Sequence, residues 1–427
     1  MSGAVALLGS PVARPARASP AAVLPAWPLL SLFYGLPLIW AAGALQFAPT
    51  VLALLMLVLL VLRRRVVVPG PAWALAVFLL WAAASSVQIG GIGSWAGFAL
   101  RWANLFSALV FLVYYVNARR SLDHWRVLRA AVAAWATLVG LGWLALVFPE
   151  ARLTTPVGLL LPGAVVGNDL VQDFVFPPLA EVQQPWGAPE PYNRPAAPFP
   201  YTHGWGSAFV ILTPLVLAHL STERFRARHL LVVAGLVASL VPAVATTNRG
   251  MFLGLGLATG YVLVRWALQG RVLPALGGTA VLAAVAGWLV ASGSVQRILG
   301  RQRYSDSTGD RGSLYADTFR AALESPLLGY GAPLLDETVG IHMGTQGYAW
   351  TLMFCYGFVG LGLFVAFLHG STLLTAGVRS TTGILVHAVP VAACVFFVYY
   401  GLDAVQFILI SLSLGVLLRA RRYGEEL

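Results

Sequence analysis

Long apolar runs constrain this chain more than any other feature of its sequence. A membrane-spanning helix needs about 20 predominantly apolar residues in succession. We identify such runs near residues 25–43, 46–62, 71–88, 97–116, 127–148, 205–220, 229–247, 250–268, 273–293, 347–368, 383–400 and 404–419. The sequence therefore predicts an all-α fold, a polytopic integral membrane helical bundle of about 12 transmembrane helices.

The composition agrees with a chain surrounded by lipid. Of 427 residues, 59% are hydrophobic and 10% are charged, whereas about a quarter of a soluble domain is charged. We expect residues 1–22, rich in Ala, Pro and Arg, to be a disordered cytoplasmic N-terminus, and residues 23–420 to be one transmembrane domain that begins with an uncleaved span. Residues 421–427 are expected to be a cytoplasmic tail.

The basic residues indicate the orientation. The net charge is +11 and every basic residue is arginine. The arginines gather at alternate turns, as in Arg63–Arg65, Arg119–Arg120 and Arg421–Arg422, and cytoplasmic loops of membrane proteins carry such an excess. We therefore expect both termini to be cytoplasmic, in a bacterial inner membrane. Nucleic-acid binding is not expected, because it needs a basic patch on a soluble surface.

Two long segments are then extracytoplasmic. Residues 149–204 are rich in Pro. Aromatic residues in this segment and directly after it are candidates for a sugar-binding surface: Trp186, Tyr192, Tyr201 and Trp205. Residues 294–346 contain a helical stripe that includes Leu314, Phe319 and Leu323. This pattern predicts a short amphipathic helix over 311–324, packed at the outer membrane surface.

The segment TTNRG, residues 246–250, is the strongest candidate for a binding site. It forms a tight external turn at which the span 250–268 begins. Asn248 is a good N-cap, and Thr247 precedes it. Arg249 adds a cation to the positive end of the helix dipole, an arrangement that favours a bound anion such as phosphate. The alternative is an interfacial arginine that contacts lipid headgroups.

Other external polar residues are weaker candidates. Arg311 again combines a cation with a helix N-terminus, and its alternative is a solvated or headgroup-facing basic loop. For Arg303 that alternative is favoured, and Arg101, inside a span, could instead extend to the membrane surface. His342 could act as a general base, with Asp336 among the alternative carboxylates. Tyr315, on the amphipathic helix, is a candidate for substrate binding. No spacing of His, Cys or Asp indicates a metal site, and no cofactor is expected.

Three segments together resemble the O-antigen ligase and polymerase superfamily. They are TTNRGMFLGLG (246–256), RGSLYADTFRAALESPLLGYG (311–331) and TQGYAWTLMFCYGFVGLGLF (345–364). The resemblance implies inverting, metal-independent transfer of a glycan from a polyprenyl diphosphate carrier to a glycan or glycolipid acceptor. It also implies that Arg249 and Arg311 hold the departing diphosphate.

The chain departs from the family at the catalytic histidine. The position of that histidine falls on Gln346, and a glutamine side chain cannot accept a proton as a base. The resemblance then leaves His342, one helical turn earlier, or a loop carboxylate as the base, with a smaller need for base catalysis as a further alternative.

Two other classes of function compete with an enzyme. One is a transporter or flippase for a polyprenyl-linked glycan or an anionic lipid, and the other is a non-catalytic assembly subunit. Transporters place ionisable groups near the middle of the membrane, on broken helices in paired halves. In this chain the candidate functional residues gather in the external segments rather than near the middle of the membrane, which favours the enzyme.

Overall fold

The computed structural model describes residues 23–63, 65–167, 169–184, 190–222, 226–300, 309–336 and 341–427. Residues 1–22, predicted to be disordered, and Trp186 and Arg303 lie outside this part. Eight of the described helices are long and apolar enough to cross a membrane. They are α4 (Gly70–Ser85, continued by the 3-10 turn η1, Ser86–Gln88), α5 (Ile92–Asn117), α6 (His124–Val147), α10 (Thr202–Thr222), α13 (Arg249–Leu268), α14 (Val272–Ala291), α17 (Tyr348–Thr375) and α19 (Ala404–Tyr423).

Shorter helices occupy the other four predicted spans. They are α1 (Trp27–Tyr34) with α2 (Leu36–Ala41), α3 (Ala48–Arg63), α11 (Ala227–Ala238) with α12 (Leu240–Ala245), and α18 (Thr381–Phe396). The first of these spans is divided at Gly35, where Pro37 has no N–H to continue the helix. A polytopic helical membrane protein is confirmed, while the count of about twelve spans stays a prediction.

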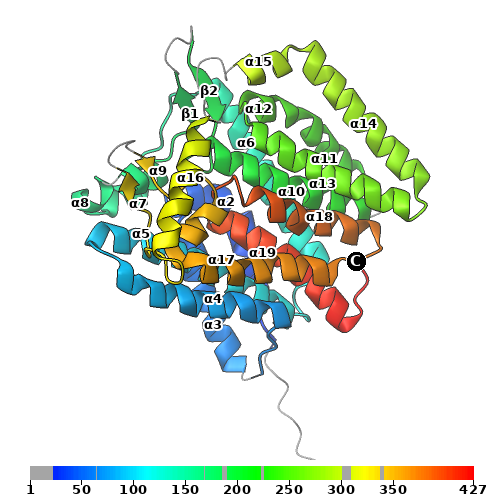
Figure 1. Cartoon of the computed structure of the whole chain (residues 1–427). Helices are drawn as coiled ribbons and strands as arrows, with labels where there is room; N and C mark the ends of the chain where they lie inside the picture. The colour runs from blue at the N-terminus through cyan, green and yellow to red at the C-terminus, as the bar shows by residue number, and fades with distance from the viewer. Residues whose placement is uncertain are drawn as a thin grey trace, which may run out of the picture.

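The centre of the bundle is α19. Its residues are buried from Ala404 to Ala420, and it packs against α5, α17 and α18 (Figure 1). The Phe407 ring lies 4.6 Å from Tyr348 of α17, between ring centroids. In contrast, α14 has no buried residue and packs on α13 at the edge of the bundle. Elements that pack on α19 are therefore in close contact with the core of the bundle.

The remaining elements lie in the two long loops. They are α7 (Pro156–Leu160), α8 (Gly163–Val166), α9 (Asp169–Val175), β1 (Ala180–Gln183), β2 (Tyr192–Pro195), α15 (Ser294–Gly300), α16 (Gly309–Glu324), β3 (Leu335–Asp336) and β4 (Ile341–His342). The strands form two antiparallel pairs, with Glu181 opposite Arg194 in the first and Leu335 opposite His342 in the second. The fold is thus α-helical with two small β-hairpins that the sequence did not predict.

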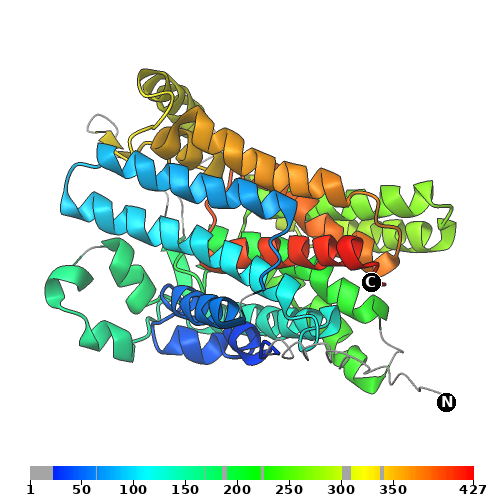
Figure 2. The ribbon, with the colours of Figure 1, turned by 90° about the horizontal axis from the view of Figure 1, so that it is seen from below.

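The loop elements gather at one end of the bundle, which we call the loop end. In Figures 1 and 2, α7, α8, α9 and α16 lie at the end away from the chain's C-terminus. The predicted amphipathic helix is confirmed as α16, which runs across the neighbouring long helices. Its buried face, Leu314, Thr318 and Ala322, has the helical spacing of four residues and packs on α17.

The opposite end contains the C-terminus, where one boundary differs from the prediction. The predicted tail begins at residue 421, but α19 continues to Tyr423 and ends at Gly424 in a left-handed conformation. Arg419 explains the extension. Its guanidinium is paired with Glu425 at 2.8 Å, donates to the Leu122 carbonyl at 2.6 Å and lies over the Tyr115 ring, so the last turn is held against the bundle.

Candidate functional site at the loop end

The turn between α12 and α13 is the core of the candidate site. Only residues 246–248 separate Ala245, the last residue of α12, from Arg249, the first of α13. Thr247 has a φ of 48°, a left-handed conformation that is unfavourable for a β-branched residue. The Asn248 side chain accepts a hydrogen bond from the Met251 amide at 3.3 Å. The predicted tight turn and N-cap are therefore confirmed.

Asn248 is also the point where three distant segments meet. Its Oδ1 accepts a 2.7 Å hydrogen bond from the Tyr400 hydroxyl, in the loop before α19. Its Nδ2 donates to the Thr202 carbonyl at the start of α10, at 3.5 Å. A Cβ at Gly206 would lie only 2.5 Å from Nδ2, so glycine there allows α10 to approach. The cap of α13 is thus fixed from two sides.

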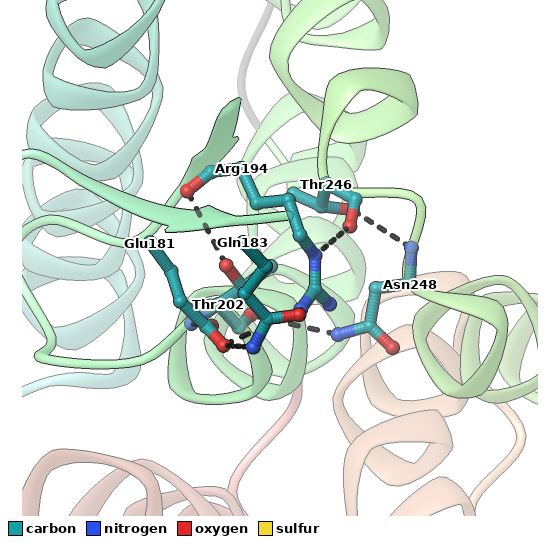
Figure 3. A network of polar contacts seen from close by, with 6 residues as sticks. All are labelled: Glu181, Gln183, Arg194, Thr202, Thr246 and Asn248. Atoms are coloured by element: carbon teal, nitrogen blue, oxygen red, sulfur yellow. Dashed lines mark hydrogen bonds and ion pairs between the residues drawn. The ribbon is translucent and has the colours of Figure 1, made fainter. Parts of the chain in front are cut away.

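Arg194 attaches the first β-hairpin to the same turn (Figure 3). Its Nε donates to the Thr246 carbonyl at 2.8 Å, and its Nη1 lies 3.2 Å from Gln183 Oε1 and 3.5 Å from Glu181 Oε1. The Arg194 side chain is buried. A buried cation is costly unless it is paired and hydrogen-bonded, and Arg194 satisfies both conditions. The hairpin therefore supports the backbone just before Arg249.

Glu181 completes this network at the start of α10. Its Oε2 accepts a hydrogen bond from the Thr202 amide at 2.9 Å. Burial alone would raise the pKa of Glu181, but Arg194, the Thr202 hydrogen bonds and His203 outweigh it and lower the pKa. Glu181 is thus a carboxylate that neutralises the N-terminal end of α10.

Two further titratable groups border the network. Asp403 is the N-cap residue of α19, and burial raises the pKa of its carboxyl group to about 6. Burial also raises the pKa of Tyr201 to about 12, with a further contribution from the charge and hydrogen bond of Asp173. No sequence motif marks Arg194, Glu181 or Asp403, because contacts across many residues leave no local pattern.

The helix α16 is the second helix with a candidate arginine in its first turn, and it packs on α17. Tyr315 stacks on Trp350 with ring centroids 4.3 Å apart, and its hydroxyl donates to the Gln346 carbonyl at 3.0 Å. Arg311 lies in the first turn of α16, one helical turn before Tyr315. The predicted residues Arg311, Tyr315 and Gln346 therefore belong to two elements that pack together.

The segment PLLGYG, residues 326–331, fits into a break in α17. Gly357 has a non-helical φ of 68° and forms the break. Directly after it, the Phe358 amide donates to the Pro326 carbonyl at 2.8 Å. On the other side, Tyr330 and Gly331 donate their amides to the carbonyls of Phe354 and Cys355. Backbone groups freed by a break in a membrane helix need such partners, so two of the family-like segments form one unit.

The other predicted residues have different positions. Asp336 and His342 lie on the paired strands β3 and β4, and their side chains, like that of Arg311, are outside the described part. Arg101 lies in α5, near the hydroxyl groups of Tyr348 and Tyr356. Its Nε and Nη2 are buried and have no hydrogen-bond partner among the described residues. The structure therefore brings Arg101 to the first turns of α17.

One aromatic candidate is wrong. Trp205 is fully buried, and its Nε1 donates to the Leu138 carbonyl at 3.1 Å. It lies inside α10 rather than in the loop, because α10 begins at Thr202. Trp205 is therefore part of the core and not of a sugar-binding surface.

Helix content, apolar spans and the loop-end cluster together define a polytopic membrane protein with a polar site at one end. A family model described as O-antigen ligase matches residues 234–351. The match includes Arg249, Arg311 and Gln346, and it confirms the resemblance to the O-antigen ligase and polymerase superfamily. No curated protein matches the chain. Over these residues the chain is similar to O-antigen ligases.

Proposed function

We propose that this protein is an inverting, metal-independent glycosyltransferase of the cell envelope. It moves a glycan from a polyprenyl diphosphate carrier to a glycan or glycolipid acceptor, as a ligase or a polymerase. The observation that carries this proposal is Arg249, which begins α13 at the loop end with no acidic residue in the first turn. The family match covers the same segment.

A comparison of three helix starts supports an anion at α13. The N-terminus of α10 has the Glu181 carboxylate on its Thr202 amide. At α17, the first amides donate to the carbonyls of Tyr400 and Phe397. The start of α13 is capped by the neutral amide group of Asn248, and the side chain of Arg249 adds a cation to the positive end of the helix dipole. An anion at this position offsets both charges.

The second cation comes from α16. Contact between Tyr315 and Gln346 holds the start of α16 near the start of α17, and α17 is joined to the Asn248 cap through Tyr400. Arg249 and Arg311 then contact the diphosphate together. Charge develops on this group as the bond to the sugar breaks, and preorganised cations stabilise that charge.

In this proposal the loop end is extracytoplasmic and both termini are cytoplasmic, in a bacterial inner membrane. Arginines at the other end support the orientation: Arg119, Arg379 and Arg421 lie near the C-terminal helix or its neighbouring turns. The external segment 149–204, with Tyr192 and Tyr201, forms part of the surface that binds the sugars in this proposal. Membrane lipid surrounds the bundle.

Variants of Arg249 test the proposal in cells. A host lacking the protein is complemented with wild type, Arg249→Gln, Arg249→Lys or Arg320→Gln, at equal membrane levels, and surface polysaccharide is measured. Arg320 is an exposed residue of α16 that pairs with Asp317 in a surface contact. We expect loss of polymer in Arg249→Gln, partial activity in Arg249→Lys and full activity in Arg320→Gln. Normal polymer with Arg249→Gln contradicts the proposal.

A further inference from the structure

His203 occupies a position that our sequence analysis overlooked. It is the second residue of α10, its side chain is exposed, and its ring stacks on Tyr201 with centroids 5.4 Å apart. A Cβ at Gly401 would lie 3.7 Å from His203 Nε2. The imidazole of His203 therefore lies close to the backbone of the loop between α18 and α19.

That loop connects His203 to the proposed diphosphate site. Tyr400, the neighbour of Gly401, donates to the Asn248 side chain at 2.7 Å, and Tyr399 donates to the Gly250 carbonyl at 3.3 Å. The residue before His203, Thr202, accepts from Asn248 through its carbonyl. Three hydrogen bonds thus join the backbone around His203 to the residues that flank Arg249.

Carboxylates lie close to the same histidine. The charge of His203 acts on Glu181, which accepts from the adjacent Thr202 amide. A Cβ at Gly204, the next residue, would lie 3.4 Å from Asp403 Oδ2. Nearby negative charge stabilises an imidazolium, as it does when a histidine acts as base in hydrolases.

We propose that His203 is the proton acceptor for the acceptor hydroxyl, in place of the histidine that is absent at Gln346. This inference rests on the proposed function. Histidine is the side chain suited to proton exchange near neutral pH. The position combines an exposed imidazole, a neighbouring carboxylate and a backbone connection to the Asn248 cap through the Thr202 carbonyl, whereas Gln346 cannot accept a proton.

The step balances without a cofactor. The acceptor oxygen forms a bond to the anomeric carbon of the donor glycan as the bond from that carbon to the diphosphate oxygen breaks. The electron pair leaves with the polyprenyl diphosphate, and the hydroxyl proton passes to His203. Solvent then removes the proton from the imidazolium. The products are the extended acceptor and the free polyprenyl diphosphate.

Purified protein tests the role of His203. The donor is lipid-linked glycan extracted from host cells that lack the protein, and the acceptor is the membrane glycolipid fraction of the same cells. The proteins are wild type, His203→Gln, His203→Ala, His342→Gln and Arg249→Gln, with Arg320→Gln as the control. Transfer is measured with and without added imidazole. Farnesyl diphosphate, as a probe of the diphosphate site, is tested for its effect on thermal transitions.

We expect both His203 variants to lose about 100-fold or more in the turnover number, the usual effect of removing a general base. His203→Ala should recover part of its activity with imidazole, and both variants should still be stabilised by farnesyl diphosphate, unlike Arg249→Gln. Arg320→Gln should remain within about threefold of wild type, a difference of under 1 kcal/mol in activation free energy. His342→Gln should lose less activity than His203→Gln and should not be rescued by imidazole.

The outcomes distinguish a failure of the role proposed for His203 from a failure of the proposed function. If wild type transfers glycan and His203→Gln does so at a similar rate, His203 is not the proton acceptor, while the proposed function stands. Loss of transfer in His342→Gln with normal transfer in His203→Gln assigns the role to His342 instead. If wild type neither transfers glycan nor responds to farnesyl diphosphate, the proposed function fails and the inference fails with it.

Discussion

The Tyr400 hydroxyl donates a 2.7 Å hydrogen bond to Oδ1 of Asn248, across 152 positions of the chain. Through this bond the loop before α19 holds the residue that caps α13. The same loop accepts the Tyr348 amide at 2.7 Å through the Tyr400 carbonyl. One residue therefore fixes the starts of two helices that contribute to the candidate site.

Removing the Tyr400 hydroxyl should weaken the site. We expect Tyr400→Phe to destabilise the protein by about 1 kcal/mol, a usual value for one buried hydrogen bond, and to reduce glycan transfer several-fold because the α13 cap is less well held. Thermal transitions in detergent and transfer rates check this. Tyr399→Phe is the matched control, since its hydroxyl makes a longer 3.3 Å contact to the Gly250 carbonyl. An equal or larger effect of Tyr399→Phe contradicts the assignment.

Alanine substitution at two glycines near the turn should have different effects on the stability of the protein. At Gly206 a Cβ would lie 2.5 Å from Asn248 Nδ2, whereas at Gly256 in α13 it would meet no atom within 4 Å. We expect Gly206→Ala to displace Asn248, with a stability loss of about 1–3 kcal/mol and reduced transfer. Gly256→Ala should be neutral or slightly stabilising, because alanine is the better helix former. Equal behaviour of the two variants in melting and transfer assays argues against close packing at residue 206.

Arg194 should matter more than an exposed arginine in the same loop. Arg194→Gln leaves Glu181 without its cation and the Thr246 carbonyl without its donor, so we expect a loss of about 3 kcal/mol, as for breaking a buried pair. Arg152→Gln breaks an exposed pair with Asp173 and should cost under about 1 kcal/mol. Thermal transitions of both variants provide the comparison, and similar values for the two contradict a buried role for Arg194.

Asp403 should make stability depend on pH. Its pKa is about 6 in the folded protein against 3.8 ordinarily, so the folded state holds the proton more tightly. The contribution of Asp403 to the free energy of unfolding is therefore fully present below about pH 3.8 and is lost as the pH rises through about 6. Asp403→Asn removes this cost and should be more stable than wild type by up to about 3 kcal/mol above pH 6.

Well below pH 3.8, at about pH 3, the Asp403→Asn variant and the wild type should have similar thermal transitions, because Asp403 is then mostly protonated in both states. A series of melting curves from about pH 3 to about pH 8 measures the difference. A constant difference across this range contradicts titration of Asp403.

Local features of the site were predictable from the sequence. The cap at Asn248, the start of α13 at Arg249 and the helix α16 depend on residues close in the chain, and these predictions are confirmed. The resemblance to the family was also predictable, because its motifs are short continuous segments.

Features that depend on distant contacts were not predictable. The bond from Tyr400 to Asn248, the contact of Arg194 with Thr246 and the fit of residues 326–331 into α17 join segments with no shared pattern. Trp205 was misplaced for a related reason. An aromatic residue beside a Pro-rich loop is expected to be exposed, but Trp205 lies one turn inside α10 and is buried. The number of spans stays open to experiment because α3 and α18 are short for a membrane crossing.

Release of polyprenyl diphosphate tests the central claim most directly. Purified wild type, Arg249→Ala and Arg311→Ala are incubated in EDTA with lipid-linked glycan from the host and with candidate acceptors, and the free diphosphate lipid is quantified. We predict acceptor-dependent release by wild type that survives EDTA and is lost in both variants. Absence of release with every acceptor, together with movement of lipid-linked glycan across vesicle membranes, contradicts the account and identifies a flippase.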